Sequence, residues 1–401
     1  MKPELLSPAG DMERLHMVLH YGADAVYLAG KEFGLRASAG NFDRDELKTA
    51  VTLCHEAGVK VHVTVNTLPR EDELARLPDY LRYLNTLGVD ALIIADLGVL
   101  SLAKQYAPDV EKHVSTQLGV VNSETCRVLY EMGASRAVLA RELSLAEIRE
   151  IRRKAPPALA LEAFVHGAMC VSFSGRCLLS NYLAGRDANR GECAQPCRWK
   201  YHLIEEKRPG EAYDITEDDG GTYILNSNDL CMIEHLPELM DAGIESFKIE
   251  GRMKSAYYAA VVTNAYRHAL DAAVDGAPLP RVWVDELQKL SHRKYCTGFY
   301  YGDPGQYYGA NDTLYFAQAD VCAVVEYCDE SGNATLTQRN RFGTGDTLEL
   351  LTCDGEPVRF TAGPMTDENS EPISEAIHPM MVFHMQLPRP CAPLSLLRKP
   401  K

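Results

Sequence analysis

Four cysteines in one glycine-rich segment are the residues best suited to chemistry. They follow the spacing C-x6-C-x15-C-x3-C, at Cys170, Cys177, Cys193 and Cys197. Four thiolates within one segment can surround a single metal centre, and thiolates prefer zinc or iron–sulfur clusters. Structural zinc sites usually contain C-x2-C pairs, which this spacing lacks. The segment therefore favours a [4Fe–4S] cluster, with zinc as the alternative occupant.

The remaining cysteines are dispersed along the chain. Free cysteine packs as a small hydrophobe, so we expect most of them to be inert. Cys231, in the stretch ILNSNDLCMIEHL, is the expected substitute ligand if one of the four fails. Buried thiols without a metal are also the alternative for the clustered four, although their polar and glycine-rich surroundings argue against it.

Polar residues that follow apolar runs predict an active site, because catalytic residues of a β/α barrel lie at the C-terminal ends of its strands. We expect catalytic roles for Glu162, His166, Arg141, Glu250 and Arg252. We expect substrate-binding roles for a second set: Arg36, Asn66, Gln117, Lys248, Lys254 and Trp199. The arginines suit a carboxylate or a phosphate, which they grip through paired N–H groups. For each arginine the alternative is a surface ion pair, and we expect Glu250 to hold Arg252 in place.

Aromatic and basic residues also alternate beside the cysteines, where Trp199 and Tyr201 flank Lys200. Aromatic side chains next to cations can stack on an unpaired base. The alternative is an aromatic lid that packs over the cluster.

Proteolysis has weaker support in the residue pattern. Ser7, Ser115 and Ser174 are available as nucleophiles, but none lies in a G-x-S-x-G turn, and no H-E-x-x-H motif occurs. His166, His113 and Glu162 have no specific pairing with these serines in the sequence.

Alternating strand-like and helical segments must position these residues. Strands are predicted at 4–10, 25–30, 59–66, 91–100, 111–117, 135–143, 159–167 and 245–251. Eight such strands with helical spacers predict a (β/α)8 TIM-type barrel over residues 1–280, with an open doubly wound sheet as the alternative. The long interval before the last strand predicts a Cys-rich insertion at about 168–235. Residues 281–313 read as a connector, and the hairpin pattern of 314–401 predicts a small C-terminal all-β barrel.

The composition indicates a globular protein with an acidic surface. The chain has 401 residues and a formal net charge of −15. This charge argues against non-specific coating of nucleic acid, but a local basic groove remains compatible with it. No apolar run is long enough to cross a bilayer, and the first residues lack the features of a secretory signal, so we expect a cytoplasmic protein without a membrane partner.

A longer pattern around the first two cysteines carries a family resemblance. Residues 162–180, EAFVHGAMCVSFSGRCLLS, fit the signature E-x-F-x2-G-[SA]-[LIVM]-C-x4-G-x-C-x-[LIVM]-S. By this signature the chain is identified as a member of the peptidase U32 family. The segments ELLSPAG, GADAVYLAG, HVSTQ, SFKIEGRMKS and SHRKYCTGFYYG also resemble that family, so the resemblance covers essentially the whole chain.

The resemblance implies hydroxylation chemistry, although the family is named for collagenase-like proteases. Its members include a tRNA hydroxylation protein that makes 5-hydroxyuridine at the wobble position, a ribosomal RNA cytidine hydroxylation protein and paired accessory proteins of anaerobic ubiquinone synthesis. The ubiquinone proteins bind a [4Fe–4S] cluster through four cysteines, and Cys170, Cys177 and Cys193 match the first three. Cys197 departs from that pattern and is similar to the RNA-modifying branch, for which prephenate is implied as a required metabolite.

The sequence is therefore compatible with three functions. The first is iron–sulfur-dependent hydroxylation of a tRNA uridine, with a small dicarboxylate bound in the barrel mouth. The second is a collagenase-like peptidase of the U32 type. The third is an accessory iron–sulfur protein that works with a partner, such as another U32 protein.

Overall fold

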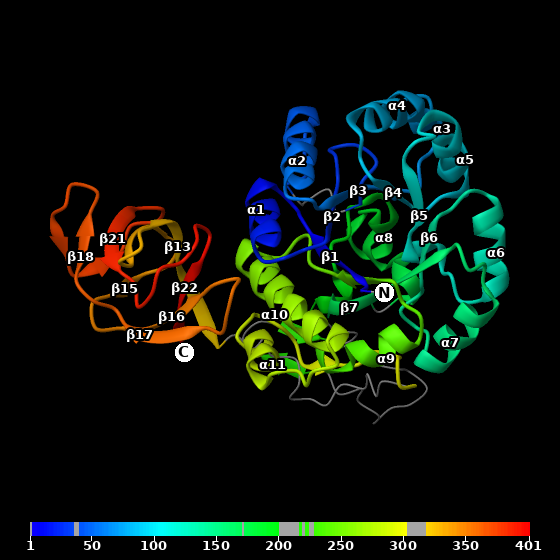
Figure 1. The fold of residues 1–401 in the computed structure, drawn as a ribbon. Coiled ribbons are helices and arrows are strands. Elements are labelled where there is room, and N and C mark those ends of the chain that lie inside the picture. Colours follow the sequence, from blue (N-terminus) through cyan, green and yellow to red (C-terminus); the bar gives the residue numbers. More distant parts are fainter. Residues whose placement is uncertain are drawn as a thin grey trace.

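Eight parallel strands form a closed barrel in the first part of the chain (Figure 1). The computed structural model describes residues 2–35, 40–170, 172–199, 216–218, 221–223, 228–302 and 318–401. The barrel is closed because β11 pairs with β1 on one side and with β7 on the other. This confirms the predicted (β/α)8 barrel and excludes the open sheet. Its strands are β1 (Glu4–Pro8), β2 (Ala25–Leu28), β3 (Lys60–Val65), β4 (Ala91–Ile94), β5 (Glu111–Val114), β6 (Arg136–Val138), β7 (Ala160–Ala168) and β11 (Ser246–Ile249).

Helices surround the strands because their apolar faces need the outer surface of the barrel as a partner (Figure 1). In α7, for example, Leu145, Ile148 and Ile151 are buried. A capping box starts α7: Ser144 and Glu147 each accept the other's backbone N–H. The helices are α1 (Met12–His20), α2 (Arg44–Glu56), α3 (Glu71–Leu74), α4 (Leu77–Leu87), α5 (Leu97–Tyr106), α6 (Ser123–Glu131), α7 (Leu145–Lys154), α9 (Leu236–Asp241), α10 (Ala256–Val274) and α11 (Arg281–Gln288).

Strand β7 extends beyond the barrel and carries two further strands. Its last residues pair antiparallel with β10 (Asp229–Cys231), which in turn pairs with β12 (Tyr295–Cys296). β7 therefore pairs with barrel strands and also with β10. Both sets of hydrogen bonds hold the strand that leads into the cysteine segment.

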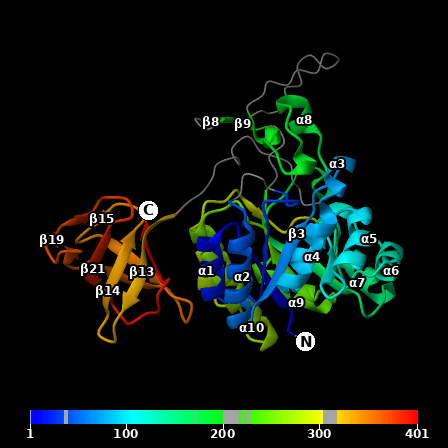
Figure 2. The same cartoon turned by 90° about the horizontal axis from the view of Figure 1, so that it is seen from above.

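The cysteine segment lies at one end of the barrel, and the N-terminus lies at the other end (Figure 2). Its regular elements are short. They are η2 (Phe173–Gly175), α8 (Leu179–Ala184), η3 (Ala188–Arg190) and η4 (Pro196–Arg198), followed by the paired strands β8 (Thr216–Asp218) and β9 (Gly221–Tyr223). No helix in the described ranges is long and apolar enough to cross a membrane.

The C-terminal part is an all-β domain, as predicted. Eight of its strands form one antiparallel sheet in the order β17-β16-β22-β13-β14-β21-β18-β19, and β15 pairs with β20. The β13–β14 and β16–β17 pairs confirm the hairpin pattern that the sequence of this part predicts. The strands are β13 (Ala319–Cys328), β14 (Asn333–Gln338), β15 (Phe342–Gly343), β16 (Thr347–Leu351), β17 (Val358–Thr361), β18 (Met365–Asp367), β19 (Pro372–Ile373), β20 (Glu375–Ala376), β21 (Val382–Gln386) and β22 (Leu396–Pro400).

A buried ionic contact joins the two domains. Arg398 of β22 is fully buried, and its guanidinium donates to Glu286 of α11 at 2.6 Å and to Glu349 of β16 at 2.9 Å. Lys289 also donates to both carboxylates at 2.8 Å. The C-terminal domain is therefore fixed to the side of the barrel by α10 and α11, away from the cysteine end (Figure 2).

Candidate functional site

One cavity of about 400 Å³ lies at the C-terminal ends of the barrel strands. Residues that follow β3, β5, β6 and β11 contribute to its wall, as a barrel active site requires. The residues of interest that line it are Tyr27, Thr64, Asn66, Ser115, Gln117, Arg141, Phe164, Cys170, Ser174, Cys177, Cys193, Cys197, Lys248, Glu250, Arg252 and Lys254. Cations and thiols therefore line the same cavity.

Lys248 supplies a buried cation to this cavity. Its Nζ donates to Oε1 of Glu162 at 2.9 Å and lies 4.7 Å from the centre of the Tyr27 ring. Glu162 is fully buried. Burial opposes ionisation of Glu162, but the charges of Lys248 and Arg136 outweigh it and lower the pKa of this carboxyl to about 2. Glu162 is therefore an anion that holds Lys248, and not a proton donor at neutral pH.

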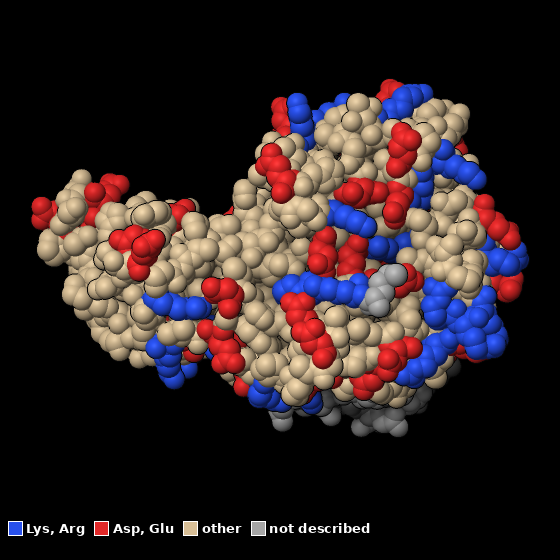
Figure 3. All heavy atoms as spheres, in the orientation of Figure 1, with Lys and Arg blue, Asp and Glu red and all other residues tan. Residues whose placement is uncertain are grey.

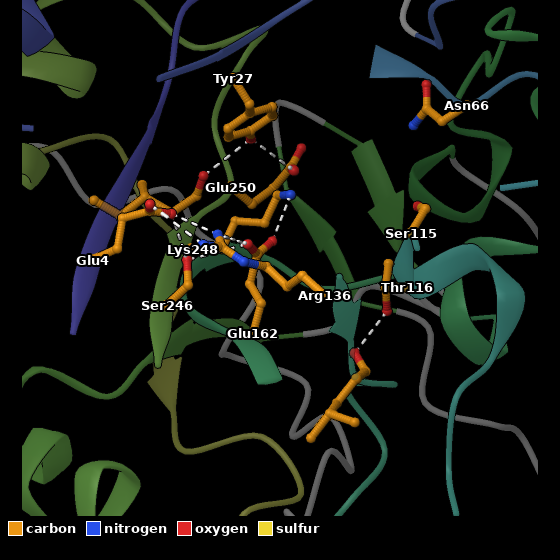
Figure 4. Close-up of polar contacts among 12 residues, drawn as sticks. Glu4, Tyr27, Asn66, Ser115, Thr116, Arg136, Glu162, Ser246, Lys248 and Glu250 are labelled. Carbon is orange, nitrogen blue, oxygen red and sulfur yellow. Dashed lines mark hydrogen bonds and ion pairs between the residues drawn. The ribbon is translucent and has the colours of Figure 1, made fainter. Parts of the chain in front are cut away.

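The network continues below Lys248 towards the N-terminal end of the barrel (Figure 4). Arg136 donates to Glu162 at 3.0 Å and to Glu4 at 2.5 Å. The hydroxyl of Ser246 lies 3.1 Å from both carboxylates. Two anions and two cations thus balance each other inside the barrel, as buried charges require.

Two arginines add positive charge to the cavity wall. Arg252 is 4% exposed, and its Nη1 donates to Oγ1 of Thr64 at 3.0 Å. Arg141 stacks on the ring of Phe164, with its guanidinium carbon 4.0 Å from the ring centre, and donates to the carbonyl of Ala168 at 2.9 Å. These contacts fix the planes of both guanidinium groups, which suits recognition of a carboxylate or a phosphate.

A polar wall of amide groups faces the cations. Asn66 donates to Oε1 of Gln117 at 3.0 Å and accepts the backbone N–H of Leu35 at the same distance. The hydroxyl of Ser115 donates to the same Gln117 oxygen at 3.3 Å. Both amides are thus held in fixed orientations, so this wall can distinguish hydrogen-bond donors from acceptors on a ligand.

A close backbone contact connects the arginine loop to the cysteine segment. Gly167 has a φ of +107°, and a Cβ at this position would lie 2.4 Å from the carbonyl oxygen of Glu250. Only glycine permits both the conformation and this approach. Tyr27 donates to the carbonyl of Ile249 at 3.0 Å and lies 3.4 Å from Oε2 of Glu250, which fixes the same turn (Figure 4).

The four cysteines of the predicted cluster all line this cavity, and all are free thiols. The backbone N–H groups of Ser172 and Leu179 point to the sulfurs of Cys170 and Cys177 at 3.4 Å. Such N–H···S contacts and the all-thiol donor set fit an iron–sulfur cluster. Within the part of the chain that is described, no three His, Cys, Asp or Glu side chains lie close enough to hold a metal ion, so a bound cluster has to draw the sulfurs together.

The structure brings most of the predicted site residues to this cavity. Those that line it are Arg141, Glu250, Arg252, Asn66, Gln117, Lys248, Lys254 and the four cysteines. Glu162 lies beneath Lys248 and does not line the cavity. Trp199 is outside the lining and is 39% exposed. Arg36, Lys200 and Tyr201 lie outside the described residues.

His166 lies away from the cavity, in the extended part of β7. It is 1% exposed, and its Nδ1 lies 3.3 Å from the hydroxyl of Tyr266. Burial lowers the pKa of His166 to about 3, so the ring is neutral in the folded protein. Cys231 lies 3.8 Å from the same hydroxyl, which places this substitute ligand among the packed side chains and not in the cavity lining.

The three serines considered for proteolysis have partners other than histidine. Ser7 lies 2.9 Å from the hydroxyl of Thr263, Ser115 donates to Gln117, and Ser174 donates to a carboxylate of the loop after β6. A serine nucleophile needs a base within hydrogen-bond distance. These hydrogen bonds therefore do not assemble a catalytic dyad.

Sequence reasoning missed several residues that shape the site. Arg136 was missed because it lies at the start of a short apolar strand and belongs to no motif. The one available indication was a charged residue within an apolar run, which implies a buried ion-pair partner. Thr64 and Tyr27 carry no motif, and their roles depend on contacts with residues distant in the sequence. Surface charge gives no simple indication either: on the face opposite the cysteines, acidic and basic side chains mix around the barrel centre (Figure 3).

The fold and the cavity together define a class of protein, a closed β/α barrel whose mouth combines cations with cysteine thiols. Family comparison covers nearly the whole chain. The model of peptidase family U32 matches residues 10–309, and the model of the peptidase family U32 C-terminal domain matches residues 317–398. This chain therefore belongs to peptidase family U32.

Several relatives of this chain are named for RNA hydroxylation. The chain is 38% identical to tRNA hydroxylation protein P1 of Bacillus subtilis, over 100% of this chain and 95% of that protein. It is 36% identical to tRNA hydroxylation protein P of Escherichia coli, over 97% of this chain and 94% of that protein. It is 35% identical to the 23S rRNA 5-hydroxycytidine C2501 synthase of Escherichia coli, over 91% of this chain and 55% of that protein.

Proposed function

We propose that this chain hydroxylates RNA, with carbon 5 of a tRNA wobble uridine as the target. In this proposal the four cysteines hold a [4Fe–4S] cluster, and the barrel mouth binds prephenate, a small dicarboxylate. The full-length similarity to two tRNA hydroxylation proteins supports the choice of tRNA.

The observation that carries the proposal is the shared cavity. Lys248 and Arg252 line the same 400 Å³ space as the four thiols. A cavity of this size suits a small metabolite or one extruded nucleobase, and not an extended peptide. An anionic ligand held by these cations would therefore occupy the same cavity as the sulfurs.

Each group of side chains has a distinct task in this proposal. When bound, the [4Fe–4S] cluster supplies a redox or Lewis-acid centre. Arg141 and Arg252 grip a carboxylate of the ligand through paired N–H groups. Lys248 adds a third cation, which its ion pair with Glu162 holds in place. Asn66 and Gln117 orient the polar groups at the other end of the ligand.

RNA binding by an acidic chain needs a local contact area or a partner. The net charge is −15, so long-range attraction to the phosphate backbone is weak. Trp199, two residues after the cavity-lining Cys197, is exposed and is a candidate for stacking on an unpaired base. A second U32 protein could supply additional contacts, which co-purification would detect.

Analysis of wobble nucleosides in a deletion strain tests the proposal. Loss of 5-hydroxyuridine derivatives, restored by the wild-type gene but not by Cys177→Ser, is the expected result. Cys328→Ser, in the C-terminal domain, is the matched control and should restore the modification. Unchanged modification in a strain without any other family member overturns the assignment. Peptide cleavage by the purified chain that survives Cys177→Ser would instead support a peptidase.

A cofactor assay separates the cluster from the RNA substrate. Anaerobically purified chain should contain iron and sulfide and should show a broad visible absorption. Zinc without sulfide in the same preparation would contradict the cluster. Holoprotein that is inactive until a co-purified partner is added would favour the accessory role.

A further inference from the structure

A carboxylate that does not belong to the buried ionic network around Lys248 binds the turn between the first two cysteines. Glu142 lies in the loop between β6 and α7. Its Oε1 accepts the backbone N–H of Ser174 at 2.7 Å, and its Oε2 accepts the Ser174 hydroxyl at 3.2 Å. Both oxygens of one side chain therefore bind one residue of the cysteine segment.

The conformation of Ser174 shows why this turn needs to be held. Its φ is +48° and its ψ is 27°, in the left-handed region that non-glycine residues rarely adopt. The side chain is 4% exposed and lines the cavity. Next to it, Phe173 approaches Gly119, where an added Cβ would lie 3.5 Å from the phenyl ring. The two bonds from Glu142 offset the cost of the strained conformation.

The second pair of cysteines has a separate attachment. Arg190 binds both oxygens of Glu73, each at 2.8 Å, and so ties the segment before Cys193 to α3. The hydroxyl of Ser180 accepts the backbone N–H of Ala194 at 3.0 Å. The two halves of the cysteine segment are thus fixed to the barrel at different places.

We propose that Glu142 is a positioning residue that holds the turn between Cys170 and Cys177 at the edge of the cavity. It touches neither a ligand nor a sulfur in this role and acts through Ser174. As far as the cluster is concerned, the inference rests on the proposed function. The geometry of the apoprotein tests it independently, because the attachment exists without a cluster.

Thiol reactivity in the full-length chain is the first measurement. The chain is treated with a chelator, reacted with N-ethylmaleimide and analysed by peptide mass spectrometry. In Glu142→Ala, alkylation of Cys177 should accelerate about tenfold, because losing a charge-assisted hydrogen bond raises the population of the open turn by that order. Cys193 should react at the wild-type rate, because Arg190 still holds its segment. Glu142→Gln keeps an acceptor for the Ser174 N–H and should restore most of the protection.

Cluster retention is the second measurement. In Glu142→Ala, anaerobically reconstituted protein should lose iron to a chelator about tenfold faster than wild type. Glu150→Ala, which removes an exposed carboxylate of α7, is the control and should behave as wild type in both assays. Equal Cys177 reactivity in Glu142→Ala and Glu150→Ala overturns the inference. If the wild type binds no iron, the cluster proposal fails, while the alkylation rates still decide the role of Glu142.

Discussion

Replacing Glu162 with glutamine should destabilise the barrel through its central ionic network. The pKa of Glu162 falls from an ordinary 4.5 to about 2 in the folded chain. One pKa unit corresponds to about 1.4 kcal/mol, so ionisation of this group stabilises the fold by about 3 kcal/mol at neutral pH. Breaking a buried ion pair by removing one partner costs about 3–5 kcal/mol, which agrees in magnitude. Arg136 then keeps its contact with Glu4, whereas Lys248 loses the carboxylate that accepts its hydrogen bond.

The pH dependence of unfolding gives the sign of this effect. Because the folded pKa is depressed, the stabilisation is complete above pH 4.5 and is lost as the pH falls towards 2. Urea denaturation should therefore show a large difference between wild type and Glu162→Gln near pH 7 and a smaller one near pH 3. Glu150→Gln is the matched control, because the pKa of Glu150 is also lowered to about 2 but its carboxylate is exposed. If both variants unfold at the same urea concentration at every pH, the reasoning is refuted.

Three further outcomes follow from other buried groups. Lys248→Met should weaken prephenate binding, measured by calorimetry, at least about tenfold, because the ligand loses one cation; unchanged affinity would place the ligand elsewhere. Arg398→Met should lower the free energy of unfolding by about 3–5 kcal/mol, because Glu286 stays buried without this partner; a denaturation midpoint equal to wild type would contradict this. His166 is neutral in the folded chain and becomes charged only on unfolding, so it lowers the free energy of unfolding as the pH falls from 6.5 towards 3. His166→Phe should therefore lose less stability than wild type over this pH range. An acid denaturation curve that superimposes on wild type would argue against this.

The barrel was predictable because its strands are short, apolar and regularly spaced. Val61, Val63 and Val65 of β3 are all buried, as their alternation and the parallel sheet together require. The extra strands β10 and β12 were not predicted, because each has only two or three residues: β10 depends on pairing with β7, and β12 depends on pairing with β10. Such short segments carry no periodicity of their own.

Strand-end reasoning located the cavity but did not distinguish its lining from its support. Asn66 and Arg252 were predicted for the mouth and line it. Glu162 and His166 lie on the same strand four residues apart, yet neither lines the cavity: the first supports Lys248 and the second packs against Tyr266. The difference arises from the extension of β7 and from contacts between distant strands, which a single sequence does not display.

The contact between Gly167 and Glu250 has a mechanical consequence. The strand that leads to Cys170 and the turn that leads to Arg252 touch backbone to backbone, with no side chain between them to absorb displacement. The position of the turn that leads to Arg252 is therefore coupled through the backbone to the strand that carries the first sulfur. Even the methyl group of an alanine at position 167 would push the two backbones apart. It would displace the turn that leads to Arg252 from the strand that leads to Cys170.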